Sequence, residues 1–346
     1  MSPEHNKPAL SVVIPTMGRP ILIQTLESLA RSEGFDSMEI VVAGWVAEGP
    51  VLAALNKLVE QHPSIIHLPV SFASGDSSEK KNAGFKASHA DIVAFLDDDV
   101  VVAKDWPLRM RETFDDPSVG LVSGPSLVPD DISPMAHLAG VALASKAAGY
   151  VSSRYLQGNP EPRRITWSRI IGCNMAYRRP VLEEIGLFDP AFWPGEEMIA
   201  SFRAMKKGYV LMFNPKAYVY HYPRESLGRF WKQIYGYGAT RIRLVRGGCD
   251  LEPTTLVPGA WVLSLVVLGA GAFFSNVFLW LLLLNLLLYL LADAWITWSK
   301  FRETRRGIDL LLIFLVPVMH LSYGVAEWVE LFRPGRDLSE KSPAVR

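Results

Sequence analysis

Three consecutive aspartates, Asp97, Asp98 and Asp99, directly follow the apolar run 92–96. This run is short and consists of β-branched, aromatic and other apolar residues, which is typical of a buried strand. Acids that directly follow a parallel strand lie at the edge of the sheet where open α/β folds bind ligands. Adjacent carboxylates raise one another's pKa unless a cation lies among them. Mg²⁺ and Mn²⁺ prefer such oxygen ligands and commonly accompany phosphorylated substrates. We therefore predict a divalent-cation site; a solvated acidic turn is the alternative.

Alternating strand and helix patterns precede the aspartates and must position them. They predict an α/β fold with a mostly parallel sheet and helices on both faces. Neither a Gly-x-Gly-x-x-Gly motif nor a Walker loop follows the first strand, so a dinucleotide cofactor is not expected. The expected strands cover 10–14, 39–43 and 65–68, and the expected helices cover 21–31, 51–61 and 78–88.

The pattern becomes mixed after the aspartates. A short strand is expected over 120–124, but 126–169 shows weak periodicity and several prolines. So long a stretch without clear elements is either a functional loop or a disordered insert, and the sequence leaves both open. It carries a basic cluster of Arg154, Arg163, Arg164 and Arg169.

The C-terminal third is strongly apolar. No charged residue occurs over 254–292. As a single helix this run would be about 58 Å long, whereas the hydrocarbon core of a bilayer is about 30 Å thick. It therefore predicts two spans, with a turn near Ser275 and Asn276, and a third apolar run follows after residue 308. Buried helices of a soluble core are the alternative, but soluble cores rarely place leucine on every face of a helix.

These patterns divide the chain. We expect an α/β domain over 1–222, a basic and aromatic interfacial segment over 223–253, a transmembrane region over 254–332 and a polar tail over 333–346. Basic residues are found before the first span and between the second and third spans. By the positive-inside rule they predict a cytoplasmic N-terminal domain. We therefore expect a multi-pass protein of the plasma (inner) membrane. The expected spans are roughly 254–274, 277–298 and 308–332.

Several segments, in order, resemble the family 2 glycosyltransferases, whose nucleotide-sugar-binding fold is called GT-A. They are Ser11 to Thr16, Lys81-Asn82-Ala83-Gly84, Phe95 to Asp99, Gly172 to Arg179, Ile185 to Asp189, Gly195-Glu196-Glu197 and Val219-Tyr220-His221. The likeness covers roughly 10–222. Two departures stand out: the second strand ends in Ala43-Gly44-Trp45, where the family usually has an aspartate that holds the base, and Glu197 stands for the usual Asp.

The resemblance implies transfer of a sugar from a nucleoside diphosphate through an oxocarbenium-like transition state. It implies a Mn²⁺ or Mg²⁺ site at Asp99 and Asp97, with His221 as a further ligand; a satisfied strand-end histidine is the alternative. Glu197 is expected to be the general base, with Glu196 as its substitute; an acidic helix start is a compatible alternative. The expected nucleotide-sugar-binding residues are Pro15, Thr16, Lys81, Asp97, Asp98 and Asn174, with Lys81 neutralising phosphate charge unless it is a solvated helix lysine.

The expected activity is therefore inverting, metal-dependent transfer of a single sugar to a hydroxyl of a membrane-associated, polyprenyl-linked acceptor in polysaccharide assembly. Gln233 to Tyr237 replaces the Gln-x-x-Arg-Trp of processive synthases, which argues against a polymer-extruding enzyme. Transfer to the polyprenyl phosphate itself and a catalytically degenerate membrane scaffold are the rivals. Lys plus Arg and Asp plus Glu both number 35, so the charge balance gives no indication of nucleic-acid binding. The sequence is silent on oligomeric state.

Overall fold

The computed structural model describes residues 7–72 and 77–333, and the chain forms two compact units. The first, here called the sheet unit, comprises the described residues up to Leu127 together with Ser153–Tyr222. The second, the helical unit, comprises Val128–Ser152 and the described residues from Pro223. The predicted polar tail, except Arg333, lies outside the described residues.

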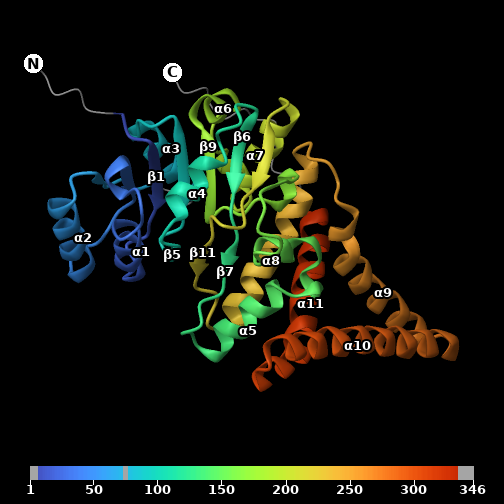
Figure 1. The fold of residues 1–346 in the computed structure, drawn as a ribbon. Coiled ribbons are helices and arrows are strands. Elements are labelled where there is room, and N and C mark those ends of the chain that lie inside the picture. Colours follow the sequence, from blue (N-terminus) through green and yellow to red (C-terminus); the bar gives the residue numbers. More distant parts are fainter. Residues whose placement is uncertain (1–6, 73–76, 334–346) are drawn as a thin grey trace, which may run out of the picture. The chain divides into compact units, whose positions relative to one another are not determined.

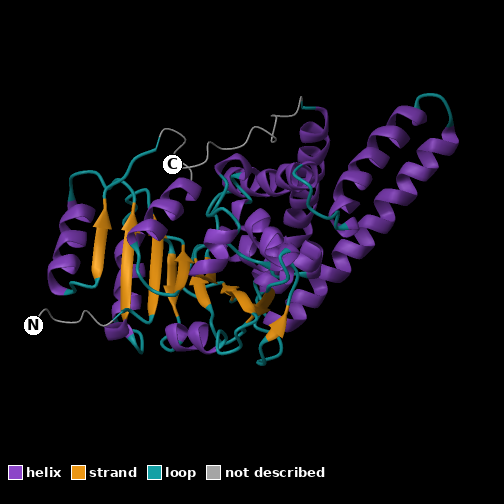
Figure 2. Cartoon of the chain, turned by 90° about the horizontal axis from the view of Figure 1, so that it is seen from above, coloured by secondary structure: helices purple, strands orange, loops and turns teal. Residues whose placement is uncertain are grey.

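The sheet unit is built on a mixed sheet. Among the described residues its strand order is β3-β2-β1-β4-β9-β6-β10-β8. The strands from β3 to β4 are parallel, whereas β9 runs antiparallel to both of its neighbours. Helices lie on both faces of this sheet (Figure 2), so the predicted α/β architecture is confirmed. The strands are β1 (Leu10–Pro15), β2 (Met38–Ala43), β3 (Ile65–Leu68), β4 (Ile92–Leu96), β6 (Val119–Ser123), β8 (Arg163–Arg164), β9 (Asn174–Arg178) and β10 (Val210–Phe213).

The central strands are apolar because both faces of the sheet are covered: every residue of β1 is buried. Helix α3 approaches β1 closely, since a Cβ added at Gly84 would lie 2.4 Å from Val13 Cγ1. The helices of this unit are α1 (Ile21–Ala30), α2 (Pro50–Gln61), α3 (Ser77–Ala87), α4 (Trp106–Glu112), α6 (Arg179–Glu184) and α7 (Glu196–Lys206), with short 3-10 turns η1 (Phe35–Ser37), η3 (Trp167–Arg169) and η4 (Pro190–Phe192).

A small second sheet adjoins the aspartates. It has the order β5-β11-β7, formed by β5 (Val100–Val102), β11 (Val219–His221) and β7 (Ser126–Leu127). Because β5 begins directly after Asp99 and pairs antiparallel with β11, His221 lies opposite Val100. Two segments more than a hundred residues apart in the chain thus bring a histidine beside the acidic run.

The helical unit includes part of the stretch expected to lack clear elements. Residues 128–152 contain the apolar helix α5 (Pro134–Leu143), which packs against α11, so the disordered-insert alternative is wrong for this part. Polar contacts hold the same segment: His137 Nε2 lies 2.7 Å from Asp309 Oδ1, and Arg306 Nη2 lies 3.0 Å from Asp130 Oδ1. The 3-10 turn η2 (Lys146–Arg154) then leads back to the sheet unit.

The remaining helices of this unit are long (Figure 1). Among the described residues, three stretches are long and apolar enough to cross a membrane: Pro253–Ala272, Asn276–Thr304 and Gly307–Phe332. Many large apolar side chains of α10 are exposed, as expected for a helix that faces lipid, and we conclude that the protein is membrane-associated. The helices are α8 (Leu227–Arg246), α9 (Val257–Ala272), α10 (Asn276–Thr304) and α11 (Leu312–Phe332), with 3-10 turns η5 (Pro253–Leu256) and η6 (Gly307–Leu311).

Candidate active site

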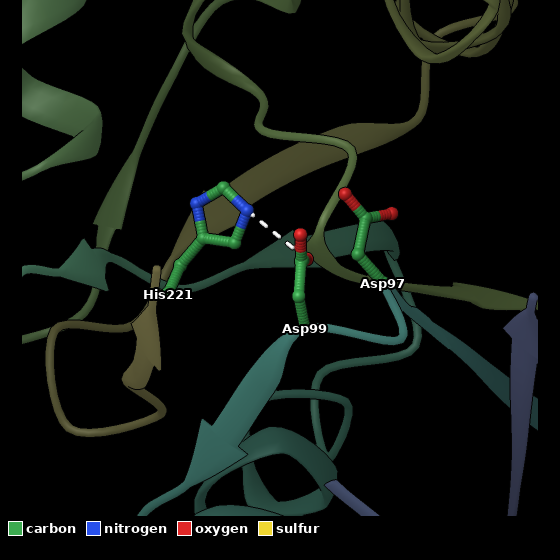
Figure 3. Close-up of side chains that lie close together, drawn as sticks. All are labelled: Asp97, Asp99 and His221. Carbon is green, nitrogen blue, oxygen red and sulfur yellow. Dashed lines mark ion pairs between the residues drawn. The ribbon is translucent and has the colours of Figure 1, made fainter. Parts of the chain in front are cut away.

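The three aspartates occupy the connection between β4 and β5. Asp97, Asp99 and His221 each offer one ligand atom, and these atoms lie within 4.8 Å of one another (Figure 3). His221 Nε2 is 3.2 Å from Asp99 Oδ1. The structure therefore brings together the three residues predicted from the sequence as metal ligands.

The chemistry of these groups fits a divalent cation. Two carboxylates and one imidazole are ligands that Mn²⁺ accepts and that Mg²⁺ accepts in part. Burial raises the pKa of Asp97, and the nearby Asp99 charge raises it further, against the opposing effect of Lys81. A cation among these carboxylates would favour their ionised forms.

Asp98 points to a different set of partners. Thr16 Oγ1 donates to its Oδ2 at 2.7 Å, and the Met17 backbone N–H donates to the same oxygen at 3.3 Å. Arg19 forms ion pairs with both Asp98 and Asp99, the latter at 3.0 Å. Asp98 thus fixes the loop after β1, where Pro15 and Thr16 were predicted to contact the nucleotide.

Arg19 was not predicted from the sequence. It stands in a loop without a recognisable motif, and its side chain remains 43% exposed while it pairs with two buried acids. The only available signal was its position four residues after the end of the first strand. A guanidinium at this place supplies positive charge next to the candidate cation site.

Glu196, the first residue of α7, is buried and fully engaged. Its Oε1 accepts hydrogen bonds from Lys81 Nζ and Ser77 Oγ, both at 2.9 Å, and its Oε2 accepts one from the Gly195 backbone N–H at 3.1 Å. Burial by itself would raise the pKa of Glu196, but Lys81 and these hydrogen bonds lower it. Glu196 is therefore held as a carboxylate that accepts three hydrogen bonds.

Glu197 has the opposite environment. It is half-buried, and burial together with the Glu196 charge raises its pKa to about 7, although Lys81 partly opposes the shift. A carboxyl group with a pKa near neutrality is suited to accept a proton in one step and release it in the next. Of the two acids, Glu197 has the environment that suits the expected general base, because Glu196 is paired with Lys81.

Lys81 connects the two acidic regions. It is 2% exposed, and although burial opposes its charge, Glu196, Asp97 and Glu197 together raise its pKa. The sequence suggested that Lys81 neutralises substrate phosphate; in the structure its ammonium group instead forms a buried ion pair with Glu196. The neighbouring Asn82 side chain exchanges two hydrogen bonds with the Phe188 backbone, at 2.7 and 3.0 Å. The Lys81-Asn82-Ala83-Gly84 motif therefore anchors α3.

The structure does not bring the Asn174 side chain to the acids as a free ligand. Asn174 is fully buried, and its Nδ2 donates to the backbone oxygens of Pro125 and Ala217, at 3.1 and 2.8 Å. Its Oδ1 accepts a hydrogen bond from Trp106 Nε1 at 2.9 Å. With both amide hydrogens used inside the protein, Asn174 braces the connections around β7 and β11 instead of offering donors to a nucleotide sugar.

Comparison with known proteins identifies the family of the chain. The model of the family described as "Glycosyl transferase family 21" matches residues 1–330. The chain is 27% identical over 171 residues to poly-beta-1,6-N-acetyl-D-glucosamine synthase of Staphylococcus aureus (strain COL), a match covering 49% of this chain and 38% of that protein. It is 29% identical over 205 residues to the pre-mycofactocin glycosyltransferase of Mycobacterium tuberculosis (strain CDC 1551 / Oshkosh), covering 57% and 42%. The matches thus span about two fifths of these relatives.

A solved structure shares the fold. The mannosyltransferase PcManGT from Pyrobaculum calidifontis, determined in complex with GDP-Man and Mn²⁺, superposes with a TM-score of 0.57 at 18% identity. The match covers 96% of this chain and 89% of that one. The GT-A type of fold expected from the sequence is confirmed, whereas the matching family model is that of family 21, in place of the family 2 that the motifs resembled.

Proposed function

The chain belongs to glycosyl transferase family 21 and is a glycosyltransferase, and we propose that it transfers a single sugar from a nucleoside-diphosphate sugar to a lipid-linked hydroxyl with inversion. The observation that carries the proposal is the cluster of Asp97, Asp99 and His221, whose ligand atoms lie within 4.8 Å of one another. The second acidic region is the pair of Glu196 and Glu197: Lys81 pairs with Glu196, while burial and the Glu196 charge raise the pKa of Glu197 to about 7.

Asp97, Asp99 and His221 are the residues that would hold Mn²⁺ or Mg²⁺. When bound, the cation supplies Lewis-acid charge against the oxygens of the diphosphate leaving group. The chain contributes Arg19 beside Asp98 and Asp99, and the loop after β1 that Thr16 fixes to Asp98. In our proposal this loop, with Pro15, contacts the nucleotide.

Glu197 accepts the proton of the acceptor hydroxyl as its oxygen attacks the anomeric carbon. The bond between that carbon and the diphosphate oxygen breaks in the same displacement, so the configuration inverts. Glu196 does not compete for the proton, because Lys81 holds it ionised and bonded. Its negative charge instead raises the pKa of Glu197.

The acceptor is proposed to be a polyprenyl-linked glycan precursor at the plasma membrane, with the sheet unit on the cytoplasmic side. Support comes from the three long apolar stretches and from the basic residues that flank them. A membrane-embedded enzyme and a lipid-anchored substrate meet in two dimensions, which raises their effective concentration.

A donor screen tests this proposal. The purified full-length protein is incubated with UDP-, GDP- and TDP-sugars and a lipid extract, with and without Mn²⁺, and release of nucleoside diphosphate is measured. We expect release with one donor class, dependent on both metal and lipid, and NMR of the product should show the inverted anomer. A retained anomeric configuration would rule out the single displacement, and release that needs neither metal nor lipid would rule out the proposed chemistry.

A further inference from the structure

The long apolar helices of the helical unit have different surroundings. In α10, Leu287, Leu288 and Leu290 lie on different sides of the helix, and all three are more than half exposed. In α11, by contrast, every residue from 315 to 328 is buried or half-buried. Helix α10 thus offers an apolar surface to lipid on several sides, whereas the middle of α11 is enclosed by protein.

Helix α8 covers the second half of α11. The Ser322 hydroxyl of α11 donates to the Trp231 backbone oxygen at 2.7 Å, and Arg246 Nη2 donates to the Leu331 backbone oxygen, also at 2.7 Å. The two helices therefore run side by side over this stretch, and a Cβ added at Gly238 of α8 would collide with the backbone of α11. Wherever the second half of α11 lies, α8 lies with it.

Helix α8 is too strongly charged for the hydrocarbon core of a bilayer. Its charged residues are all basic: Arg229, Lys232, Arg241, Arg243 and Arg246. Arg229 and Lys232 are exposed, and Arg243 forms an ion pair with Glu330 of α11, with 3.8 Å between nitrogen and oxygen. Charged side chains are costly inside a bilayer, above all where they face lipid. The second half of α11 is therefore held against a helix that belongs outside the core.

The first half of α11 is held by residues 128–152, which leave the sheet unit after β7 and later return to it. Helix α5 of this segment packs against α11. His137 Nε2 lies 2.7 Å from Asp309 Oδ1, shortly before α11 begins, and the Ala147 backbone oxygen lies 2.9 Å from Nε2 of His320 in the middle of α11. If α11 crossed the bilayer, this segment would have to follow it, although both of its ends belong to the sheet unit.

The charges around α11 also favour one side of the membrane for both of its ends. The connection between α10 and α11 is basic over 300–306. The sequence after α11 carries four basic residues against two acidic ones: Arg333, Arg336, Lys341 and Arg346 against Asp337 and Glu340. Three spans would put these two basic regions on opposite sides, whereas the positive-inside rule places both in the cytoplasm.

We propose that the hairpin of α9 and α10, over its uncharged run 254–292, is the part of the chain that enters the bilayer, and that α11 stays outside the hydrocarbon core. Each arm, α9 or α10 up to residue 292, is about 25 Å long, close to the core thickness of about 30 Å. Phe273 and Phe274, between the arms, are 91% and 88% exposed, which suits a tip in apolar surroundings. The residues before α9 and after α11 consequently lie on the same side. This inference concerns anchoring and does not depend on the proposed donor, metal or acceptor.

Cysteine labelling of the full-length protein in its membrane tests the side on which α11 ends. Glu303→Cys, before α11, and Arg333→Cys, after it, are placed separately in a background of Cys173→Ala and Cys249→Ala. The two native side chains are similarly exposed, at 61% and 64%. Intact and permeabilised spheroplasts are treated with a membrane-impermeant maleimide, and labelling in SDS gives the total reactive thiol. We expect both sites to react only after permeabilisation. Reaction of Arg333→Cys, but not of Glu303→Cys, in intact spheroplasts would show that α11 crosses the bilayer and would overturn the proposal.

Quenching by lipid tests the hairpin itself. A bimane fluorophore is attached to Leu288→Cys in α10 or, as the control, to Arg333→Cys, in the same cysteine background. The protein is reconstituted into phosphatidylcholine vesicles with and without lipids that are brominated in their acyl chains. We expect brominated lipid to quench the probe at position 288 and to leave the probe at position 333 unquenched. Equal fluorescence of the position 288 probe in both kinds of vesicle would overturn the proposal. Neither measurement uses sugar transfer, so both results are independent of the donor screen.

Discussion

The acidic run after β4 and the acidic pair at the start of α7 use similar residues for different purposes. In the run, the Arg19 guanidinium pairs with Asp98 and Asp99, and the His221 imidazole lies 3.2 Å from Asp99. In the pair, one cation serves two acids unequally, because Lys81 bonds to Glu196 and leaves Glu197 with a pKa of about 7. The comparison shows that neighbouring charges, more than residue type, decide whether a carboxylate binds a cation or a proton.

The largest effect is expected at Glu197. Glu197→Gln keeps the size of the side chain but removes its basicity, so kcat/KM should fall about a thousandfold, within the range for loss of a general base. Mn²⁺ affinity and Tm should remain at wild-type values. Sugar transfer and thermal unfolding of the full-length protein check both points, and an active Glu197→Gln variant would remove the distinction between the two acids.

Asp99→Asn tests the other region. Asparagine is close to isosteric with aspartate but lacks its charge, so Mn²⁺ affinity and kcat/KM should each fall about a hundredfold, equivalent to about 2.7 kcal/mol. Calorimetric titration with Mn²⁺ and steady-state kinetics measure the two quantities. Asp91→Asn, at an exposed aspartate paired with Lys7, is the control and should change neither. Equal Mn²⁺ binding by Asp99→Asn and wild type would contradict the cation site.

Lys81→Met should mainly affect stability. Lys81 and Glu196 are both almost fully buried, and removing one partner of a buried ion pair typically costs about 3 kcal/mol of unfolding free energy. The double variant Lys81→Met/Glu196→Gln should recover most of this loss, because no unpaired charge remains. Urea unfolding of the wild type, Lys81→Met, Glu196→Gln and the double variant, followed by fluorescence, gives the coupling energy. A coupling energy near zero would show that the pair does not hold α3 to α7.

The smallest effect is expected at Arg19. Its side chain is 43% exposed, and pairs of this kind contribute little, so Arg19→Gln should raise the KM for the donor only about threefold and leave kcat unchanged. Arg31→Gln, at an exposed i,i+4 pair with Glu27, serves as the matched control. A hundredfold loss in kcat for Arg19→Gln would instead place the guanidinium at the reacting phosphate.

The sequence predicted the elements that carry strong local patterns. The strand expected over 65–68 is β3, and the acids lie directly after β4, whose short run of branched and aromatic residues predicts a buried strand. The turn near Ser275 is also found, since α9 ends at Ala272 and α10 begins at Asn276. Such features depend on residues close in the chain.

Long-range partners could not be derived in the same way. The ion pairs of Arg19 arise only when β1 and β4 lie side by side, and Lys81 meets Glu196 only after α3 and α7 pack. Helix α5 was missed because 126–169 contains prolines and little amphipathic periodicity; α5 is apolar on nearly every side and owes its place to packing against α11. Tertiary contacts, which overrule local propensity, decide such cases.

The acidic limb of the pH–rate profile tests most directly whether burial and the Glu196 charge set the basicity of Glu197. Because the pKa of Glu197 is raised to about 7, the base is lost to protonation as the pH falls through that value, and kcat/KM at saturating Mn²⁺ should decrease below it. In Glu196→Gln the negative charge that raises this pKa is gone and Lys81 is released, so the limb should move to lower pH. An unshifted limb in Glu196→Gln, or a flat wild-type profile between about pH 5 and 8, would contradict the account.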